Sequence, residues 1–249
     1  MADSRLVVDL NGVSFRYGNE KKVLDNVSFQ LREGDKIGLI GDNGSGKTTL
    51  LHLIVGLIKS QRGDISIFER PVATEAGFLE VRKKIGILFQ NTDDQLFCPT
   101  VLEDVAFGPL NLGYSADEAK EIAHATLQRL GLHGFEHRIT HELSGGEKRI
   151  VALATILSMH PRVLLLDEPT SGLDDSTKHR LKEILADLDL SYIIVSHEYD
   201  FLAQSTCKIF GLKGGSIRFH GDATALHSHF HTHLGGQVSH RHARCNMAP

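Results

Sequence analysis

The chain has 249 residues, of which 41% are apolar and 23% are charged, and its formal net charge is −4. These values are ordinary for a globular protein of one large or two small domains, and the acidic balance argues against nucleic acid as the main partner. No run of about 18 uncharged apolar residues occurs in the sequence, so no single segment is predicted to span a bilayer.

Short β-branched runs alternate with longer helical patterns along the chain. This alternation predicts an α/β fold with a mostly parallel central sheet. The predicted strands cover residues 6–10, 36–40, 64–68, 85–89, 163–167, 192–196 and 208–212. The run 36–40 leads into a glycine-rich stretch and then a helical pattern over 47–56, which together form a strand–loop–helix unit.

Residues 100–160 lack strand signals, and their patterns indicate helices. Ser115 is a predicted N-cap, because Glu118 three residues later completes a capping box and apolar residues follow at helical spacing. This helix is predicted over 115–130, with Gly131 as its stop. A second helical pattern covers 146–159. We therefore expect a helical insertion at 100–160 within a folded domain of residues 1–226.

Residues 227–249 are rich in histidine and show little hydrophobic periodicity, so we expect a separate, mobile tail. Imidazole is a common ligand of Ni²⁺, Co²⁺, Zn²⁺ and Cu²⁺, which makes a loose metal site one hypothesis. The other hypothesis is a polar tail without a role. The histidines concerned are His227, His229, His231, His233, His240 and His242.

The glycine-rich stretch after residue 40 matches the P-loop pattern, in which glycine is followed by four residues and then Gly-Lys-Thr. Its glycines let the backbone wrap closely around phosphate oxygens, and the following helix presents its positive end to the same anion. Lys47 is predicted to reach the β- and γ-phosphates, Thr48 to ligate Mg²⁺ and Thr49 to contact the α-phosphate. The predicted phosphate-binding residues are Gly41, Asn43, Gly44, Ser45, Gly46, Lys47, Thr48 and Thr49.

The apolar run 163–166 ends in two carboxylates, Asp167 and Glu168. A parallel strand buried on both faces has this composition, and ligands bind at the carboxyl ends of such strands. Together with the P-loop upstream, this position predicts that Asp167 holds Mg²⁺ and that Glu168 orients or deprotonates the attacking water.

A further motif, Leu143-Ser144-Gly145-Gly146-Glu147, stands just before the second predicted helix. It resembles the signature of ABC ATPases, which usually ends in Gln where this chain has Glu147. In that family two chains associate head-to-tail, and the signature of each covers the ATP in the P-loop of the other. The resemblance implies that Ser144, Gly145 and Gly146 form a second anion site at a helix N-terminus.

The other motifs of the family follow in the same order. Gln90 matches the Q-loop glutamine, which joins the Mg²⁺ site to the helical insertion, and the run 171–174 matches the D-loop at the dimer interface, with Asp174 at its end. His197 matches the switch histidine near the γ-phosphate. Tyr17 matches the aromatic residue that stacks on adenine.

The resemblance also implies the fold and the chemistry. The expected fold is that of a P-loop NTPase, with an N-terminal antiparallel β subdomain and an inserted α-helical subdomain beside the mostly parallel sheet. The expected activity is hydrolysis of ATP with Mg²⁺, in which Glu168, His197 and Gln90 act as the catalytic residues and Gln90 joins Thr48 and Asp167 at the metal.

The stretch 89–109 resembles the ATPases of energy-coupling-factor importers, and with the histidine tail it is most like those for cobalt or nickel. Such a chain would lie peripherally on the cytoplasmic face of the cell membrane, drive integral-membrane subunits, and pair with a second copy or a paralogous ATPase. Two alternatives are the ATPase of a vitamin importer of the same type and a soluble ABC ATPase that moves no cargo. The latter class usually carries long coiled-coil insertions or tandem ATPase halves, and this sequence has neither.

Overall fold

The computed structural model describes residues 4–19 and 21–223. The tail predicted at 227–249, with its candidate metal-binding histidines, lies outside the described residues, so the domain limit at 226 stays a prediction. None of the helices in the described ranges is both long and apolar enough to cross a membrane. In chain order the helices and strands are β1 (Leu6–Phe15), β2 (Leu24–Arg32), β3 (Lys36–Ile40), α1 (Lys47–Ile54), β4 (Arg62–Ile67), β5 (Arg70–Pro71), α2 (Glu75–Arg82), β6 (Ile85–Leu88), α3 (Val101–Asn111), α4 (Ala116–Arg129), α5 (Gly145–Leu157), β7 (Val163–Asp167), α6 (Asp175–Ala186), β8 (Ser191–Val195), α7 (Tyr199–Ser205), β9 (Lys208–Lys213) and β10 (Ser216–Asp222).

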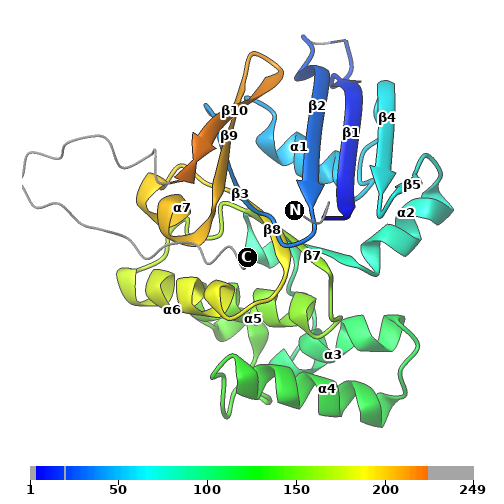
Figure 1. The fold of residues 1–249 in the computed structure, drawn as a ribbon. Coiled ribbons are helices and arrows are strands. Elements are labelled where there is room, and N and C mark those ends of the chain that lie inside the picture. The colour runs from blue at the N-terminus through cyan, green and yellow to red at the C-terminus, as the bar shows by residue number, and fades with distance from the viewer. Residues whose placement is uncertain (1–3, 20, 224–249) are drawn as a thin grey trace, which may run out of the picture.

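The strands form two sheets (Figure 1). The smaller sheet is antiparallel, with strand order β2-β1-β4-β5. The larger sheet has the order β10-β9-β3-β8-β7-β6, in which only β10 runs antiparallel to its neighbour. The prediction of an α/β protein with a mostly parallel central sheet and an antiparallel β subdomain is therefore confirmed.

Strand β7 is packed on both faces of the larger sheet. Val163 and Leu165 point into a core shared with α1 and the antiparallel sheet. Leu164 and Leu166 point into a second core with helices α3 to α7. All five residues of β7 are buried, because successive side chains of a strand point to opposite faces and both faces are packed.

Helices α3, α4 and α5 gather on the side of the large sheet away from the antiparallel sheet, at the bottom of Figure 1. The residues between α3 and α5 contain no strand in the described structure. Ile139 forms a single isolated bridge with Thr100, the residue before α3. Helix α5 approaches β6 so closely that a Cβ on Gly86 would lie 2.0 Å from the Cγ2 atom of Ile156. Only glycine permits this contact.

The predicted capping box of α4 is present. The Ser115 hydroxyl accepts a hydrogen bond from the Glu118 N–H, and the Glu118 carboxylate accepts one from the Ser115 N–H. Gly131, the predicted stop, has φ 69°, a left-handed conformation that suits the residue after a helix. Strands β2, β5 and β10 and helices α2, α3, α6 and α7 were not predicted from the sequence.

Candidate active site

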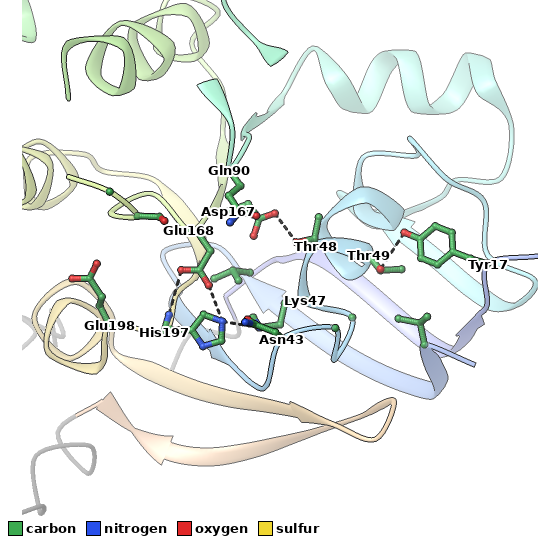
Figure 2. A pocket seen from close by; sticks show the side chains of 16 residues that line it. Tyr17, Asn43, Lys47, Thr48, Thr49, Gln90, Asp167, Glu168, His197 and Glu198 are labelled. Atoms are coloured by element: carbon green, nitrogen blue, oxygen red, sulfur yellow. Dashed lines mark hydrogen bonds and ion pairs between the residues drawn. The ribbon is translucent and has the colours of Figure 1, made fainter. Parts of the chain in front are cut away.

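A cavity of ≈ 820 Å³ opens at the carboxyl ends of β3, β7 and β8 (Figure 2). Parallel sheets place the residues after neighbouring strands at one edge, so the P-loop, the two carboxylates and His197 meet there. Tyr17 lies at one end of the cavity, and Glu168 and His197 lie at the other. The lining residues are Tyr17, Val23, Asn43, Gly44, Gly46, Lys47, Thr48, Thr49, Gln90, Asp167, Glu168, Ser171, Gly172, Val195, His197 and Glu198.

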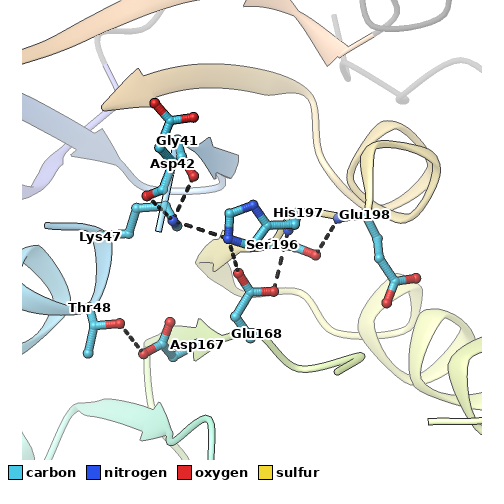
Figure 3. Close-up of polar contacts among 9 residues, drawn as sticks. All are labelled: Gly41, Asp42, Lys47, Thr48, Asp167, Glu168, Ser196, His197 and Glu198. Atoms are coloured by element: carbon cyan, nitrogen blue, oxygen red, sulfur yellow. Dashed lines mark hydrogen bonds and ion pairs between the residues drawn. The ribbon is translucent and has the colours of Figure 1, made fainter. Parts of the chain in front are cut away.

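The P-loop curls around the Lys47 side chain. Lys47 is 7% exposed, and its Nζ donates to the carbonyl oxygens of Gly41 at 2.7 Å and Asp42 at 3.0 Å (Figure 3). Burial lowers the pKa of the Lys47 ammonium, and the carboxylate of Glu168 opposes that shift. Gly46 has φ 106° and passes so close to Val23 that a Cβ would lie 2.8 Å from its Cγ1 atom, so the turn into α1 requires glycine here.

Thr48 and Asp167 form the polar centre of the cavity. The Thr48 hydroxyl donates to Asp167 Oδ2 at 2.7 Å, whereas Oδ1 of the same carboxylate is buried without a hydrogen-bond partner among the described residues. Burial raises the pKa of the Asp167 carboxyl, and the hydrogen bond from Thr48 opposes the rise. A buried carboxylate oxygen without a donor suits a site that is completed by a cation.

Glu168 is held over the end of the P-loop by His197. Its Oε2 accepts the His197 backbone N–H at 3.3 Å, and its Oε1 lies 3.2 Å from His197 Nε2. The same Nε2 lies 3.4 Å from Lys47 Nζ. The backbone of Glu168 is left-handed, with φ 46°, a conformation that is strained for this residue type and is fixed here by its N–H bond to Val195. Burial raises the pKa of the Glu168 carboxyl, while His197 acts against the rise.

Tyr17 connects the far end of the cavity to the P-loop helix. Its hydroxyl lies 3.2 Å from the Thr49 hydroxyl, and its ring meets Phe15 edge to face with centroids 4.8 Å apart. The ring is 44% exposed, which leaves much of its surface open to a ligand.

Gln90 lines the cavity through a contact that the sequence did not predict. Arg149, on α5, is 5% exposed, and its guanidinium donates to the carbonyl oxygens of Phe89 and Gln90, both at 2.8 Å. Lys148 adds an ion pair with Asp93 at 2.7 Å. Helix α5 therefore holds the backbone that carries Gln90. No linear motif in the sequence pointed to Arg149.

The signature residues lie outside this cavity. Ser144 is the N-cap of α5, and Gly145 and Gly146 form its first turn. A Cβ on Gly146 would lie 2.8 Å from the Thr177 hydroxyl, so glycine lets α5 approach the start of α6. Asp174, also outside the cavity, caps α6 by accepting the Thr177 N–H at 2.8 Å.

The family model of the ABC transporter matches residues 24–171. The chain belongs to the ABC transporter family. It is an ATPase of that family, which hydrolyses ATP, and it is an ATPase subunit of an ABC transporter.

Two relatives of this ABC ATPase cover most of its length. An ABC transporter ATP-binding protein of Nitratidesulfovibrio vulgaris is 50% identical over 95% of this chain and 86% of its own. The energy-coupling factor transporter ATP-binding protein EcfA of Methanothermobacter thermautotrophicus is 40% identical over 85% of this chain and 69% of its own.

Two solved structures share the fold. CbiO1 from Clostridium perfringens, part of the ABC transporter complex CbiONQ, has a TM-score of 0.80 and 31% identity, covering 89% of this chain and 90% of its own. A dimeric ATP-binding cassette in a post-hydrolysis state, bound to ADP and phosphate, has a TM-score of 0.79 and 27% identity, covering 86% of this chain and 98% of its own.

The Arg149 contact leads to a testable expectation. Arg149→Met removes two part-buried hydrogen bonds to carbonyl oxygens, so we expect the free energy of unfolding to fall by about 2 kcal/mol. The backbone of Gln90 also loses its hydrogen bond from Arg149. We therefore expect kcat to fall by more than the decrease in the fraction of folded protein accounts for. Chemical denaturation and steady-state ATPase assays measure the two effects.

The matched control is Lys148→Met, one residue away, whose ion pair joins the exposed Asp93. We expect it to change stability by at most about 1 kcal/mol. Equal effects of the two substitutions would contradict the role given to Arg149.

Proposed function

We propose that this ABC ATPase energises an energy-coupling-factor importer of Co²⁺ or Ni²⁺, as a peripheral subunit on the cytoplasmic face of the membrane. The similarity to EcfA and to CbiO1 supports the importer type. The resemblance of residues 89–109 to these ATPases and the histidines of 227–242 support the metal cargo. The alternative cargo is a vitamin, carried by an importer of the same type.

One observation carries the proposed pairing of two chains: the signature lies outside the cavity that contains the P-loop. The cavity contains the P-loop, Asp167 and Glu168, whereas Ser144 and the start of α5 lie outside it. A second anion site at a helix N-terminus has no phosphate to bind within its own chain. We infer that two copies, or one copy and a paralogue, pair head-to-tail around two ATP molecules, as the similarity to a dimeric cassette supports.

The residues at the P-loop fit a nucleotide with Mg²⁺. Lys47 would exchange its carbonyl contacts for the β- and γ-phosphates, with the backbone N–H groups of residues 43–48 around them. Thr48, Asp167 and Gln90 would hold Mg²⁺, and the unpartnered Oδ1 of Asp167 suits such a cation. When bound, Mg²⁺ would neutralise charge on the transferred phosphoryl group. At the other end, the open ring of Tyr17 would stack on adenine.

Glu168 would act as the general base. Its carboxylate is directed into the cavity by its own left-handed backbone and by two contacts with His197. Burial raises its pKa, which strengthens it as a proton acceptor, and His197 opposes part of that rise. In this arrangement Glu168 takes a proton from the attacking water, and His197 holds Glu168 in place beside Lys47.

Glu168→Gln tests this assignment, because the amide keeps the size of the side chain but cannot take a proton. We expect ATPase activity to fall at least about 100-fold while ATP binding persists. With hydrolysis blocked, ATP and Mg²⁺ should convert the protein to a dimer in analytical ultracentrifugation.

Glu33→Gln is the control, since Glu33 pairs with Arg162 far from the cavity lining and should not alter either readout. Full activity in the Glu168 variant would refute the general-base role.

The membrane partner would bind the exposed apolar side chains beside α3. Phe97 and Phe107 are 63% and 44% exposed, and their rings meet edge to face with centroids 4.8 Å apart. Leu110 and Tyr114 are exposed nearby along the chain. An exposed apolar set of this kind marks an interaction site. In the resembling importers, the same segment receives the coupling helices of a membrane subunit.

Phe97→Ser combined with Phe107→Ser should abolish recovery of integral-membrane subunits when the tagged protein is purified from native membranes. ATPase activity of the isolated protein should remain, because neither ring lines the nucleotide cavity. Mass spectrometry identifies the partners and, through the substrate-binding subunit, the cargo.

Phe219→Ser, at a 57% exposed phenylalanine on β10, is the control and should retain the membrane subunits. Recovery of soluble partners alone, from the unaltered protein, would instead support the ABC ATPase that moves no cargo.

A further inference from the structure

The signature of this chain contains a negative charge at the place where a phosphate is expected. Glu147 occupies the third position of α5, and its Oε2 accepts hydrogen bonds from the Ser144 N–H at 2.9 Å and from the Ser144 hydroxyl at 2.8 Å. These bonds lower the pKa of the Glu147 carboxyl, so the group is ionised at neutral pH. A carboxylate at this position satisfies the helix N-terminus itself and repels a second anion.

Arg138 offsets that charge. Its Nη1 donates to Glu147 Oε1 at 2.8 Å, on the carboxylate oxygen that Ser144 does not use. The two oxygens of Glu147 are thus shared between the helix cap and the guanidinium. The side chains are 48% and 32% exposed, so the pair lies at the surface where a second chain would meet the signature.

The position of Arg138 is fixed by its surroundings. Its guanidinium carbon lies 3.7 Å from the ring centroid of Phe135, over the ring face. Its backbone N–H donates to the Phe135 carbonyl, and its own carbonyl accepts from the N–H of Val101, the first residue of α3. The stacking on Phe135 therefore holds the guanidinium beside Glu147 and reduces the side-chain entropy that the ion pair costs.

We propose that Arg138 is a positioning residue that neutralises Glu147, so that the start of α5 accepts the γ-phosphate of a nucleotide held by a second copy. The proposal rests on the head-to-tail dimer of the proposed function. Without Arg138, the phosphate would meet an uncompensated carboxylate at the start of α5, and the like charges would repel each other. A Gln at position 147 would remove the need for Arg138 altogether.

A double-mutant cycle tests the proposal in the hydrolysis-blocked Glu168→Gln protein, with ATP-driven dimer formation measured by analytical ultracentrifugation. We expect Arg138→Gln to weaken the ATP-bound dimer by about tenfold, because the dimer contains two such pairs and each contributes a few-fold. Arg138→Lys should recover much of the loss, since it keeps the charge. In the Glu147→Gln background, Arg138→Gln should change the dimer affinity less than about twofold.

Salt gives a second readout, because the charge effect should shrink as ionic strength rises. Arg129→Gln is the control: it removes the same charge from α4, at an exposed residue with no ion pair in the described part of the chain.

If Arg138→Gln weakens the dimer equally with Glu147 and with Glu147→Gln, its role is structural and the proposal is overturned. The proposal is also overturned if Arg138→Gln weakens the dimer in neither background. Failure of the Glu168→Gln parent to dimerise with ATP would instead overturn the proposed head-to-tail dimer, and the inference with it.

Discussion

The burial of β7 on both faces is the constraint on which the active site depends. Its four apolar residues are fully buried, which fixes the strand in the sheet and places Asp167 and Glu168 where it ends. The neighbouring strands β8 and β6 deliver His197 and Gln90 to the same edge, and β3 delivers the P-loop. Both carboxylates are poorly solvated, so burial raises the pKa of each. Among the residues that the structure describes, none donates a hydrogen bond to Oδ1 of Asp167.

In the proposed function, the groups that would bind phosphate and metal lie together in one cavity, and the signature lies outside it. Helix α5 joins the two places. Its N-terminus carries Ser144 beside Glu147 and Arg138, and one turn later Arg149 holds the backbone of Gln90. In the proposed dimer, the same helix would contact the nucleotide of the partner and the metal site of its own chain. Helix α5 would then link the closure of the dimer around the partner's nucleotide to the position of Gln90 at the metal site of its own chain.

Sequence patterns predicted the parts of this structure that are local. Strands β3 and β7 are short, mostly apolar runs and were predicted with the ends that the structure has. The capping box lies within the four residues from Ser115 to Glu118, and the helix predicted over 115–130 is one residue longer at each end than α4. Strand β2 was missed because it is half solvated and is interrupted at Asn26, which has φ 54°. Helix α3 contains Gly108 and Pro109, which normally end a helix, and a Cβ on Gly108 would lie 2.5 Å from the Cγ atom of Met159. The roles of Arg149 and Arg138 depend on contacts between segments that are distant in sequence, which no motif encodes.

The most direct test of the composite site mixes two inactive proteins. Lys47→Ala destroys the P-loop half of the site, and Ser144→Arg destroys the signature half. If the site forms between chains, mixed dimers contain one intact site, and an equal mixture should regain up to about a quarter of the unaltered ATPase activity. If each chain hydrolyses ATP with its own residues alone, the mixture will remain as inactive as its components, and the head-to-tail dimer will be refuted.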